Sequence, residues 1–275
     1  MSVSFQDTGL TSNTQYFYRV RARAGDDYSG YSSIVSATTL SLFDLVLADG
    51  ATIAFKFNES SGNILNYGSG GSAYDLTQVS STITRDVTGV SGPDVKAITT
   101  SSSNGSTPTY GHMQGVRSTL SGNQAVTLEC ILKVPLNATK TVVNMNSTDA
   151  GNTALELSVD SGTGALRAGI AVTGQPFTSS TLTTSGVNSA FKHVVATWNG
   201  SNWIGYYQGA QIFSTAIGGG GTGIFDGAAT HGLAVGGFYN DGTVNCAGTF
   251  DFLGIYFGTI LTPTQVSAHF ALSGC

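Results

Sequence analysis

The sequence predicts an all-β protein whose strands pair antiparallel. Residues 194–198 are apolar, residues 199–202 read Asn-Gly-Ser-Asn, and apolar residues resume at position 203. This is the pattern of a β-hairpin, because Asn and Gly both tolerate positive φ in the turn. The run Val126–Val134 alternates between two sets of positions, as a strand does. Only 10% of the residues are charged, against about 25% in ordinary soluble proteins, and Ser, Thr, Asn and Gly take their place.

Size and charge limit the function. At 275 residues the chain can hold one large β domain, or one domain and a fragment. The net charge of −5 argues against nucleic acid as a partner. Residues 42–48 are apolar but interrupted by Asp44 and far shorter than the roughly 20 residues that span a bilayer, so no membrane partner is expected. The start, MSVSFQDTGL, does not resemble a secretory signal. We therefore expect either a piece of something larger or a protein that leaves the cell by another route.

Residues 1–40 are predicted to form strands that lack a covering sheet. Tyr16, Tyr18 and Val20 alternate with Phe17 and Arg19, as in a half-buried strand. With Leu10 six residues before Tyr16, the segment resembles the last three strands of a fibronectin type III domain, including its tyrosine corner. The first four strands of such a domain are missing. We expect another copy of the chain to complete the segment, so that the protein is a homo-oligomer through residues 1–40; an upstream portion of the same polypeptide is the alternative.

The rest of the chain is predicted to be a linker, residues 41–49, and a second domain, residues 50–275. That domain opens with Ile53, Phe55 and Phe57 at alternate positions. Residues 99–109 form a polar loop. Further alternating strands follow at 154–159 and 166–172. A last helix begins after Thr262, which can cap it together with Gln265, so that residues 266 and 270 face the sandwich.

Three separated motifs in residues 50–274 resemble laminin G-like, concanavalin A-like domains. They are FKFNESSGNILNYGSGGSAYDLT, HVVATWNGS followed by the YYQGAQI turn, and GTFDFLGIYFGTILTPTQV. The resemblance implies a two-sheet antiparallel jelly-roll sandwich. The chain departs from the family pattern at four positions that are usually acidic: Asn58, Asn66, Gln208 and Phe252.

The same resemblance implies a possible calcium ion at the sandwich rim. The matching positions are Glu59, Asn66 and Asp251. Calcium prefers charged oxygen ligands, and amides at two of the usual acid positions lower the expected affinity. The alternative is that Asp251 bonds a nearby loop backbone. No cofactor is required by the sequence.

Nothing in the sequence predicts an enzyme. Glucanases of the concanavalin A-like fold carry a carboxyl pair on one strand, and the nearest approach, Glu156 and Asp160 in LELSVD, has the wrong spacing. We expect these to be solvent-facing charges. The histidines have no metal-ligand spacing, and His193 is expected to pack in the core. The three cysteines allow one disulfide at most, and Cys130 is expected to be a buried thiol.

Carbohydrate binding is the chemistry that the side chains favour, since sugars need aromatic faces and planar polar groups. The loop Gly236–Gly248 offers both and lies where loops gather at one end of a sandwich. Phe238 and Tyr239 could equally be core residues. The candidate ligand-binding residues are the aromatic residues expected to be exposed and the polar residues beside them: Trp203, Tyr206, Phe238, Tyr239, Asn240, Asp241 and Asn245.

The sequence therefore predicts a non-catalytic adhesion or decoration protein. Secreted bacterial enzymes and phage virion proteins both combine these domain types, and the lack of a secretory signal at the start of the sequence favours a bacteriophage virion component, such as a tail, fibre or capsid decoration, at an extracellular or virion surface. Its expected partner is a surface glycan or another virion or cell-surface protein. The alternative is a carbohydrate-binding module from a larger secreted bacterial protein or enzyme.

Overall fold

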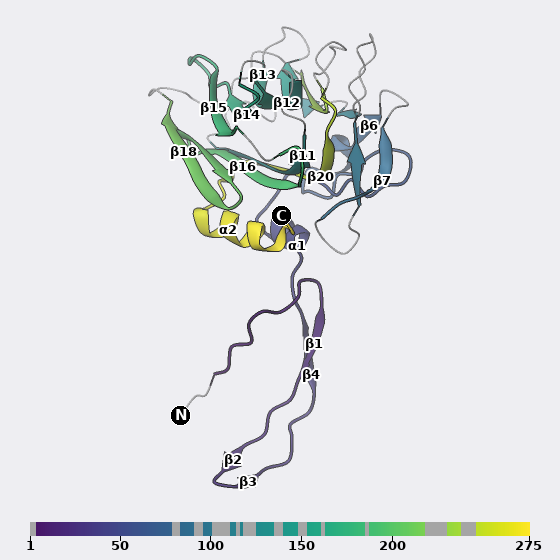
Figure 1. Cartoon of the computed structure of the whole chain (residues 1–275), viewed down its shortest axis with the longest axis vertical. Helices are drawn as coiled ribbons and strands as arrows, with labels where there is room; N and C mark the ends of the chain where they lie inside the picture. The colour runs from purple at the N-terminus through teal and green to yellow at the C-terminus, as the bar shows by residue number, and fades with distance from the viewer. Residues whose placement is uncertain are drawn as a thin grey trace.

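The computed structural model shows a three-layer body with an extended arm (Figure 1). Two antiparallel β-sheets form two of the layers and two helices form the third. The structure describes residues 4–78, 83–90, 96–100, 111–113, 116–117, 125–134, 140–147, 153–160, 163–184, 187–217, 230–237 and 246–275.

The sheet next to the helices, called here the β11 sheet, has the strand order β18-β17-β16-β11-β20-β8-β7, with β5 also paired to β20. Its strands are β5 (Ile53–Phe55), β7 (Thr84–Thr88), β8 (Lys96–Thr99), β11 (Val126–Lys133), β16 (Lys192–Trp198), β17 (Asn202–Tyr207), β18 (Ala210–Ala216) and β20 (Thr249–Phe257).

The second sheet, called here the β12 sheet, has the order β15-β14-β13-β12-β19-β9-β6, with β10 paired to β19. Its strands are β6 (Leu76–Gln78), β9 (Gly111–Met113), β10 (Val116–Arg117), β12 (Lys140–Ser147), β13 (Thr153–Val159), β14 (Leu166–Ile170), β15 (Thr178–Thr183) and β19 (Thr230–Val235). A short 3₁₀ helix, η1 (Gly71–Tyr74), precedes β6. The predicted all-β sandwich is confirmed.

The main core lies between the two sheets. Alternate residues of β11, from Val126 to Val134, point into it, as the sequence pattern predicts. The hairpin of β16 and β17 is confirmed too, with Trp198 paired to Trp203 across the strands and Gly200 at a φ of 91° in the turn. The predicted polar loop at 99–109 lies outside the described residues beyond position 100.

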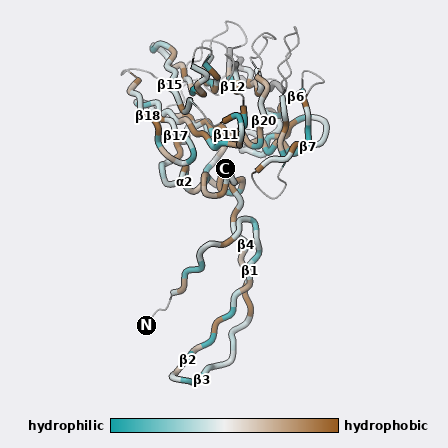
Figure 2. The backbone as a smooth tube through the Cα atoms, viewed as in Figure 1, coloured by the Kyte–Doolittle hydropathy of each residue, from teal (hydrophilic) through white to brown (hydrophobic). Residues whose placement is uncertain are grey.

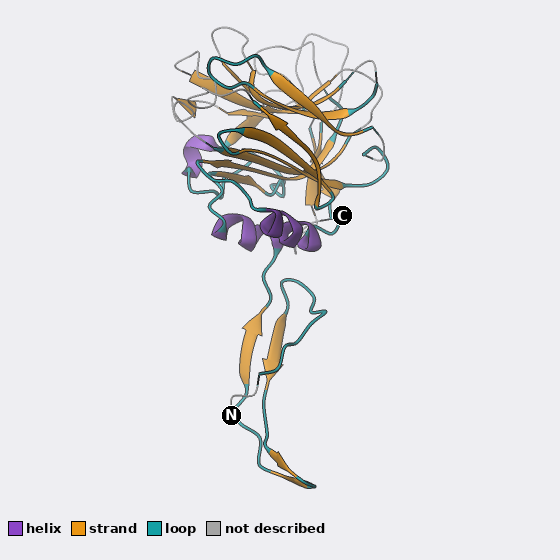
Figure 3. Ribbon diagram, turned by 90° about the vertical axis from the view of Figure 1, so that its left-hand side faces the viewer, coloured by secondary structure: helices purple, strands orange, loops and turns teal. Residues whose placement is uncertain are grey.

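A second core lies between the β11 sheet and the helices α1 (Leu42–Ala48) and α2 (Pro263–Leu272) (Figure 3). Helix α2 begins as predicted, since Thr262 and Gln265 form a capping box. The residues expected to be a linker instead contain α1, whose Leu42 and Val46 are buried. Its own capping box joins Ser41 to Asp44.

Residues 4–40 form the arm, which projects away from the helix side of the body, on the side opposite the β12 sheet (Figures 1 and 2). It contains the two-stranded pairs β1 (Gln15–Tyr18) with β4 (Val35–Thr38), and β2 (Arg23–Ala24) with β3 (Asp27–Tyr28). The hydroxyl of Tyr16 accepts a hydrogen bond from the Thr11 backbone N–H at 2.8 Å. Such a bond to the upstream backbone is what a tyrosine corner makes.

The helices that the structure describes are short, and none of them has the length and apolar character needed to cross a membrane.

Candidate functional site

The candidate site is the end of the sandwich where the loop Gly236–Gly248 begins and ends. Of this loop the structure describes residues 236–237 and 246–248. The Cys246 N–H donates to the Gly236 carbonyl at 2.9 Å, so the two ends of the loop are tied together. The Gly236 N–H in turn donates to the Val142 carbonyl at 2.7 Å, which ties the loop base to β12.

Thr100 fixes this base to the β11 sheet. Its buried hydroxyl donates to the Cys246 carbonyl at 2.6 Å and accepts from the Gly248 N–H at 3.1 Å. Gly236 has a φ of 83°, and a Cβ at that position would meet the Thr100 side chain at 2.6 Å. Glycine is therefore required there, for backbone conformation and for space. Hydrogen bonds thus hold the base of the loop to both sheets, and loops positioned by a fixed scaffold are the usual setting for binding residues.

An open pocket of about 190 Å³ adjoins the loop base. Lys133 supplies its cation, and the Lys133 ammonium also lies 5.2 Å from the centre of the Phe191 ring. Hydroxyl and amide groups add donors and acceptors, and the Thr99 and Thr249 hydroxyls are 3.0 Å apart. The pocket is lined by Thr99, Lys133, Val134, Asn188, Ala247, Gly248 and Thr249.

The predicted ligand-binding residues fall into two groups. Phe238, Tyr239, Asn240, Asp241 and Asn245 lie outside the described residues.

Trp203 and Tyr206 are buried, and the expectation that they are exposed is wrong. Trp203 is 0% exposed, and its indole N–H donates to the Ala168 carbonyl of the other sheet at 3.1 Å. Tyr206 is 3% exposed and belongs to the core beneath the helices. An aromatic strand residue alternates in the same way whether solvent, a helix or the other sheet covers its face, so the sequence pattern could not separate these cases.

The three residues proposed for calcium each have protein partners. Glu59 Oε1 accepts from the Leu65 N–H at 3.0 Å. Asn66 Oδ1 accepts from the Ala54 N–H at 2.8 Å, and Asp251 Oδ1 accepts from the Val90 N–H at 2.8 Å. Thus Asp251 does bond a loop backbone. Within the described ranges no group of three or more His, Cys, Asp or Glu side chains is placed to hold a metal ion.

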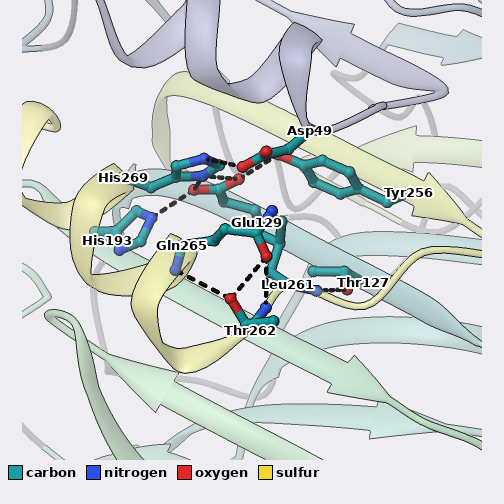
Figure 4. Close-up of polar contacts among 9 residues, drawn as sticks. All are labelled: Asp49, Thr127, Glu129, His193, Tyr256, Leu261, Thr262, Gln265 and His269. Atoms are coloured by element: carbon teal, nitrogen blue, oxygen red, sulfur yellow. Dashed lines mark hydrogen bonds and ion pairs between the residues drawn. The ribbon is translucent and has the colours of Figure 1, made fainter.

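A buried polar cluster, which the sequence did not predict, lies between the β11 sheet and α2 (Figure 4). At its centre Glu129 Oε1 is 2.7 Å from His193 Nε2 and 3.0 Å from His269 Nδ1. The Tyr256 hydroxyl donates to Glu129 Oε2 at 2.7 Å, and His269 Nε2 lies 2.9 Å from Asp49 Oδ2. Glu129, His193 and His269 are all 0% exposed.

The charges of this cluster stabilise one another. Burial alone would raise the pKa of Glu129, but hydrogen bonds from His193 and His269 hold that pKa at about 2. Burial would lower the pKa of His269, but its bonds to Glu129 and Asp49 raise it above the ordinary value. Burial beside the Glu129 carboxylate raises the pKa of the Tyr256 hydroxyl. Each group therefore has a bonded partner on a different element, and the arrangement holds α1 and α2 on the sheet.

The sequence also makes predictions for the three cysteines and for Glu156 and Asp160. Cys130 is a buried thiol as expected, and Cys246 and Cys275 are thiols as well, not half-cystines. Asp160 pairs with Arg167 at 3.0 Å. Glu156 was expected to face solvent, but it is partly buried, and burial raises the pKa of its carboxyl group.

No family model matches the chain, and no curated protein does. Solved structures with a similar fold include the botulinum neurotoxin serotype D binding domain, at 14% identity and a TM-score of 0.58 over 82% of this chain and 52% of that chain. The botulinum neurotoxin type G receptor-binding domain is 12% identical, with a TM-score of 0.56 over 81% of this chain and 51% of that chain. The binding domain of Paraclostridial Mosquitocidal Protein 1 is 17% identical, with a TM-score of 0.59 over 82% of this chain and 52% of that chain.

At sequence identities this low, the structural similarity shows a shared β-sandwich fold and nothing finer. The chain spans about half the length of the solved chains that it matches.

Proposed function

We propose that this chain is a non-catalytic, extracellular binding module of the laminin G-like type, which recognises a surface glycan or another surface receptor through the loop Gly236–Gly248 and the pocket beside it. The observation that carries the proposal is the loop base, which Thr100 and Gly236 fix to both sheets next to an open pocket. Fixing both ends of a loop reduces the conformational entropy that the loop loses on binding.

The pocket has the chemistry for a polyhydroxylated ligand. Lys133 and Asn188 offer N–H donors, and the Thr99 and Thr249 hydroxyls can donate or accept. Binding sites of this kind combine a concave surface with a few convergent polar groups. The aromatic residues of the loop, Phe238 and Tyr239, would supply the stacking faces. The structurally similar proteins include a botulinum neurotoxin receptor-binding domain and the binding domain of a mosquitocidal protein, which is consistent with this class of function.

A glycan array probed with the full chain tests the proposal. Binding is expected to be lost in the double variant Phe238→Ala, Tyr239→Ala and weakened in Lys133→Met. The control is Lys56→Met, since Lys56 also lies over a phenylalanine ring, 4.4 Å from the centre of Phe43, but lines no part of the pocket. Binding that survives in the double variant and in Lys133→Met alike would rule out this end of the sandwich.

The arm supports a role inside an assembly, and the preferred setting is a bacteriophage tail, fibre or capsid decoration. The arm exposes large apolar side chains, such as Phe17, which is 66% exposed, and Val20, which is 72% exposed. Contiguous exposed apolar surface of this kind marks a site of contact with another protein. The alternative setting is a carbohydrate-binding module of a larger secreted bacterial protein. Immunogold imaging of the native source distinguishes them: labelled particles or fibres support the virion setting, and label on single secreted molecules supports the alternative.

A further inference from the structure

We propose that the outer face of the β12 sheet carries a second ligand site, for a neutral saccharide, built from Asn144, Glu156, Arg167 and the ring of Phe177. The outer face is the one turned away from the core between the sheets and from the helices (Figure 1). This site is distinct from the loop Gly236–Gly248. Only its ligand class rests on the proposed binding function.

Strand pairing places the polar groups in one row. Asn144 of β12 lies directly opposite Glu156 of β13, and Glu156 lies opposite Gly169 of β14. The neighbours of these residues along each strand, such as Met145, Leu157 and Ala168, belong to the main core. Since side chains alternate between faces, the row from Asn144 to Gly169 points outward. It spans two strand spacings, about 10 Å, which is the length of one or two sugar rings.

Asn144 has an acceptor that lacks a partner. The residue is 0% exposed, and within the part of the chain that the structure describes its Oδ1 accepts no hydrogen bond. Its Nδ2 makes one long contact, 3.4 Å to the Thr153 hydroxyl. A buried acceptor without a partner costs about 1–3 kcal/mol, so native proteins rarely keep one without a use. A hydroxyl of a bound ligand would supply the missing donor.

Arg167 adds a buried donor that lacks a hydrogen-bond partner among the described residues. Its Nη1 pairs with Asp160 at 3.0 Å and its Nη2 donates to the Ser179 carbonyl at 3.1 Å. These bonds fix the guanidinium group, while its buried Nε–H has no acceptor among the described residues. Arg167 is two residues before Gly169 on β14 and therefore points to the same face. Burial raises the pKa of the Glu156 carboxyl group, and the Arg167 charge partly opposes that rise.

Phe177 provides an apolar face at the edge of the row. Its ring lies against Gly169 and fills the space of the missing side chain, since a Cβ there would come within 2.3 Å of the ring Cζ. Nevertheless the residue is 47% exposed. Exposure thus rises along the row, from buried Asn144 through partly buried Glu156 to Phe177, as in a site with a polar floor and an aromatic rim.

The combination points to a neutral saccharide. Sugar hydroxyls can donate to Asn144 Oδ1 and to the Glu156 carboxylate and accept from Arg167 Nε, while a C–H face stacks on Phe177. An anionic ligand fits poorly, because the Glu156 carboxylate is central to the row and the Arg167 charge already pairs with Asp160. An apolar ligand would leave Asn144 Oδ1 and Arg167 Nε buried without hydrogen-bond partners.

The test is a titration of the ¹⁵N-labelled full chain with lactose, maltose and cellobiose, followed by NMR. We expect saturable shifts at the amides of residues 144, 156 and 169 for at least one disaccharide. Phe177→Ala and Glu156→Gln should each weaken that affinity by about tenfold or more, equivalent to about 1.4 kcal/mol. The control is Ile212→Ala, since Ile212 is equally exposed at 47% but lies on β18 of the other sheet.

Three results would overturn the proposal. They are the absence of shifts with all three disaccharides, equal affinities of Phe177→Ala and Ile212→Ala, and shifts confined to the base of the loop, residues 236–237 and 246–248. The last result would support the first site while removing the second, so the two proposals can fail separately.

Discussion

At the scale of single residues, buried polar groups differ in whether they are satisfied. Asn144 Oδ1 has no partner among the described residues, whereas the equally buried Thr127 hydroxyl bonds the Thr197 hydroxyl at 2.8 Å and accepts from the Leu261 N–H at 3.2 Å. Apolar replacements of similar size should therefore have opposite effects on stability.

We expect Asn144→Leu to raise the free energy of unfolding by about 1 kcal/mol, because it removes a buried acceptor that has no hydrogen-bond partner among the described residues. Thr127→Val should lower that free energy by about 1–3 kcal/mol, since it leaves the partners of the hydroxyl unpaired. Urea denaturation of both variants measures the difference. If Asn144→Leu is destabilised as much as Thr127→Val, the amide has a bonding role that the structure does not show. Stabilisation together with loss of saccharide binding would be the trade-off expected of a functional polar group.

The buried polar cluster centred on Glu129, called here the Glu129 cluster, predicts how the free energy of unfolding depends on pH. Its members are Glu129, His193, His269, Tyr256 and Asp49. The pKa of Glu129 is lowered from 4.5 to about 2, so its contribution, about 3 kcal/mol, is present above pH 4.5 and is lost as the pH falls through 2. The pKa of His269 is raised from 6.5, so its contribution is present below pH 6.5 and is lost as the pH rises through the raised value. Stability from these two groups should thus be greatest between pH 4.5 and 6.5.

Unfolding by urea across pH 3 to 9 checks this prediction. The alkaline decline should be weaker in His269→Gln, and Glu129→Gln should be destabilised by about 3–5 kcal/mol at pH 6, because a buried charged partner is left behind. Glu59→Gln is the matched control, since Glu59 bonds a loop N–H away from the cluster. A wild-type protein that gains stability steadily from pH 6 to 9 would contradict the assignment of His269.

At the scale of elements, the two helices show what a sequence pattern can and cannot predict. Helix α2 was predicted because Thr262, Pro263 and Gln265 are standard signals of a helix start. Helix α1 was missed although Ser41 and Asp44 form the same kind of cap. Its seven residues are nearly all apolar, so no helical period separates a buried stripe from an exposed one.

Helix α1 should therefore contribute to stability as part of the body. Val46→Ala is expected to cost about 1–3 kcal/mol, since Val46 is 0% exposed beneath the β11 sheet. Leu47→Ala, one position further on the same helix, should cost less than about 0.5 kcal/mol because Leu47 is 39% exposed. Thermal or urea unfolding compares the two. Equal, small effects would mean that residues 41–49 do behave as a linker.

The Glu129 cluster shows the limit of prediction between elements. Alternation in β11 predicts correctly that Glu129 and Val126 lie on opposite faces. It cannot predict that a helix from the other end of the chain covers the Glu129 face and brings His269 to it, 140 residues away in sequence. Burial of Trp203 and Tyr206 was missed for the same reason: a strand pattern defines faces, and only the three-dimensional arrangement says what covers each face.

At the scale of the whole molecule, the arm stands out because both faces of its β1–β4 pair carry exposed apolar side chains. In the pair of β1 and β4, Phe17 lies opposite Ser36 and Tyr18 lies opposite Val35, so Phe17 and Val35 are on different faces. Both are more than 60% exposed, at 66% and 62%. Stacking of Arg19 on Tyr31 and Arg21 on Tyr28, with guanidinium carbons 3.9 and 3.8 Å from the ring centres, covers the tip only in part, since both tyrosines remain about half exposed. A two-stranded ribbon is marginally stable in water, and its free edges favour pairing with another strand.

We therefore predict that the full chain self-associates through residues 1–40. Burying a large apolar side chain contributes about 1.5–3 kcal/mol, so covering several of them can sustain an oligomer. Sedimentation velocity of the full chain should show a dimer or larger species that dissociates in the double variant Phe17→Ser, Val35→Ser. Ile212→Ser and Ile260→Ser, which change residues on the body that are 47% and 42% exposed, should leave the association unchanged. A monomeric full chain whose arm amides exchange freely with solvent would exclude self-association, and would favour an upstream segment of the same polypeptide as the surface that completes the arm.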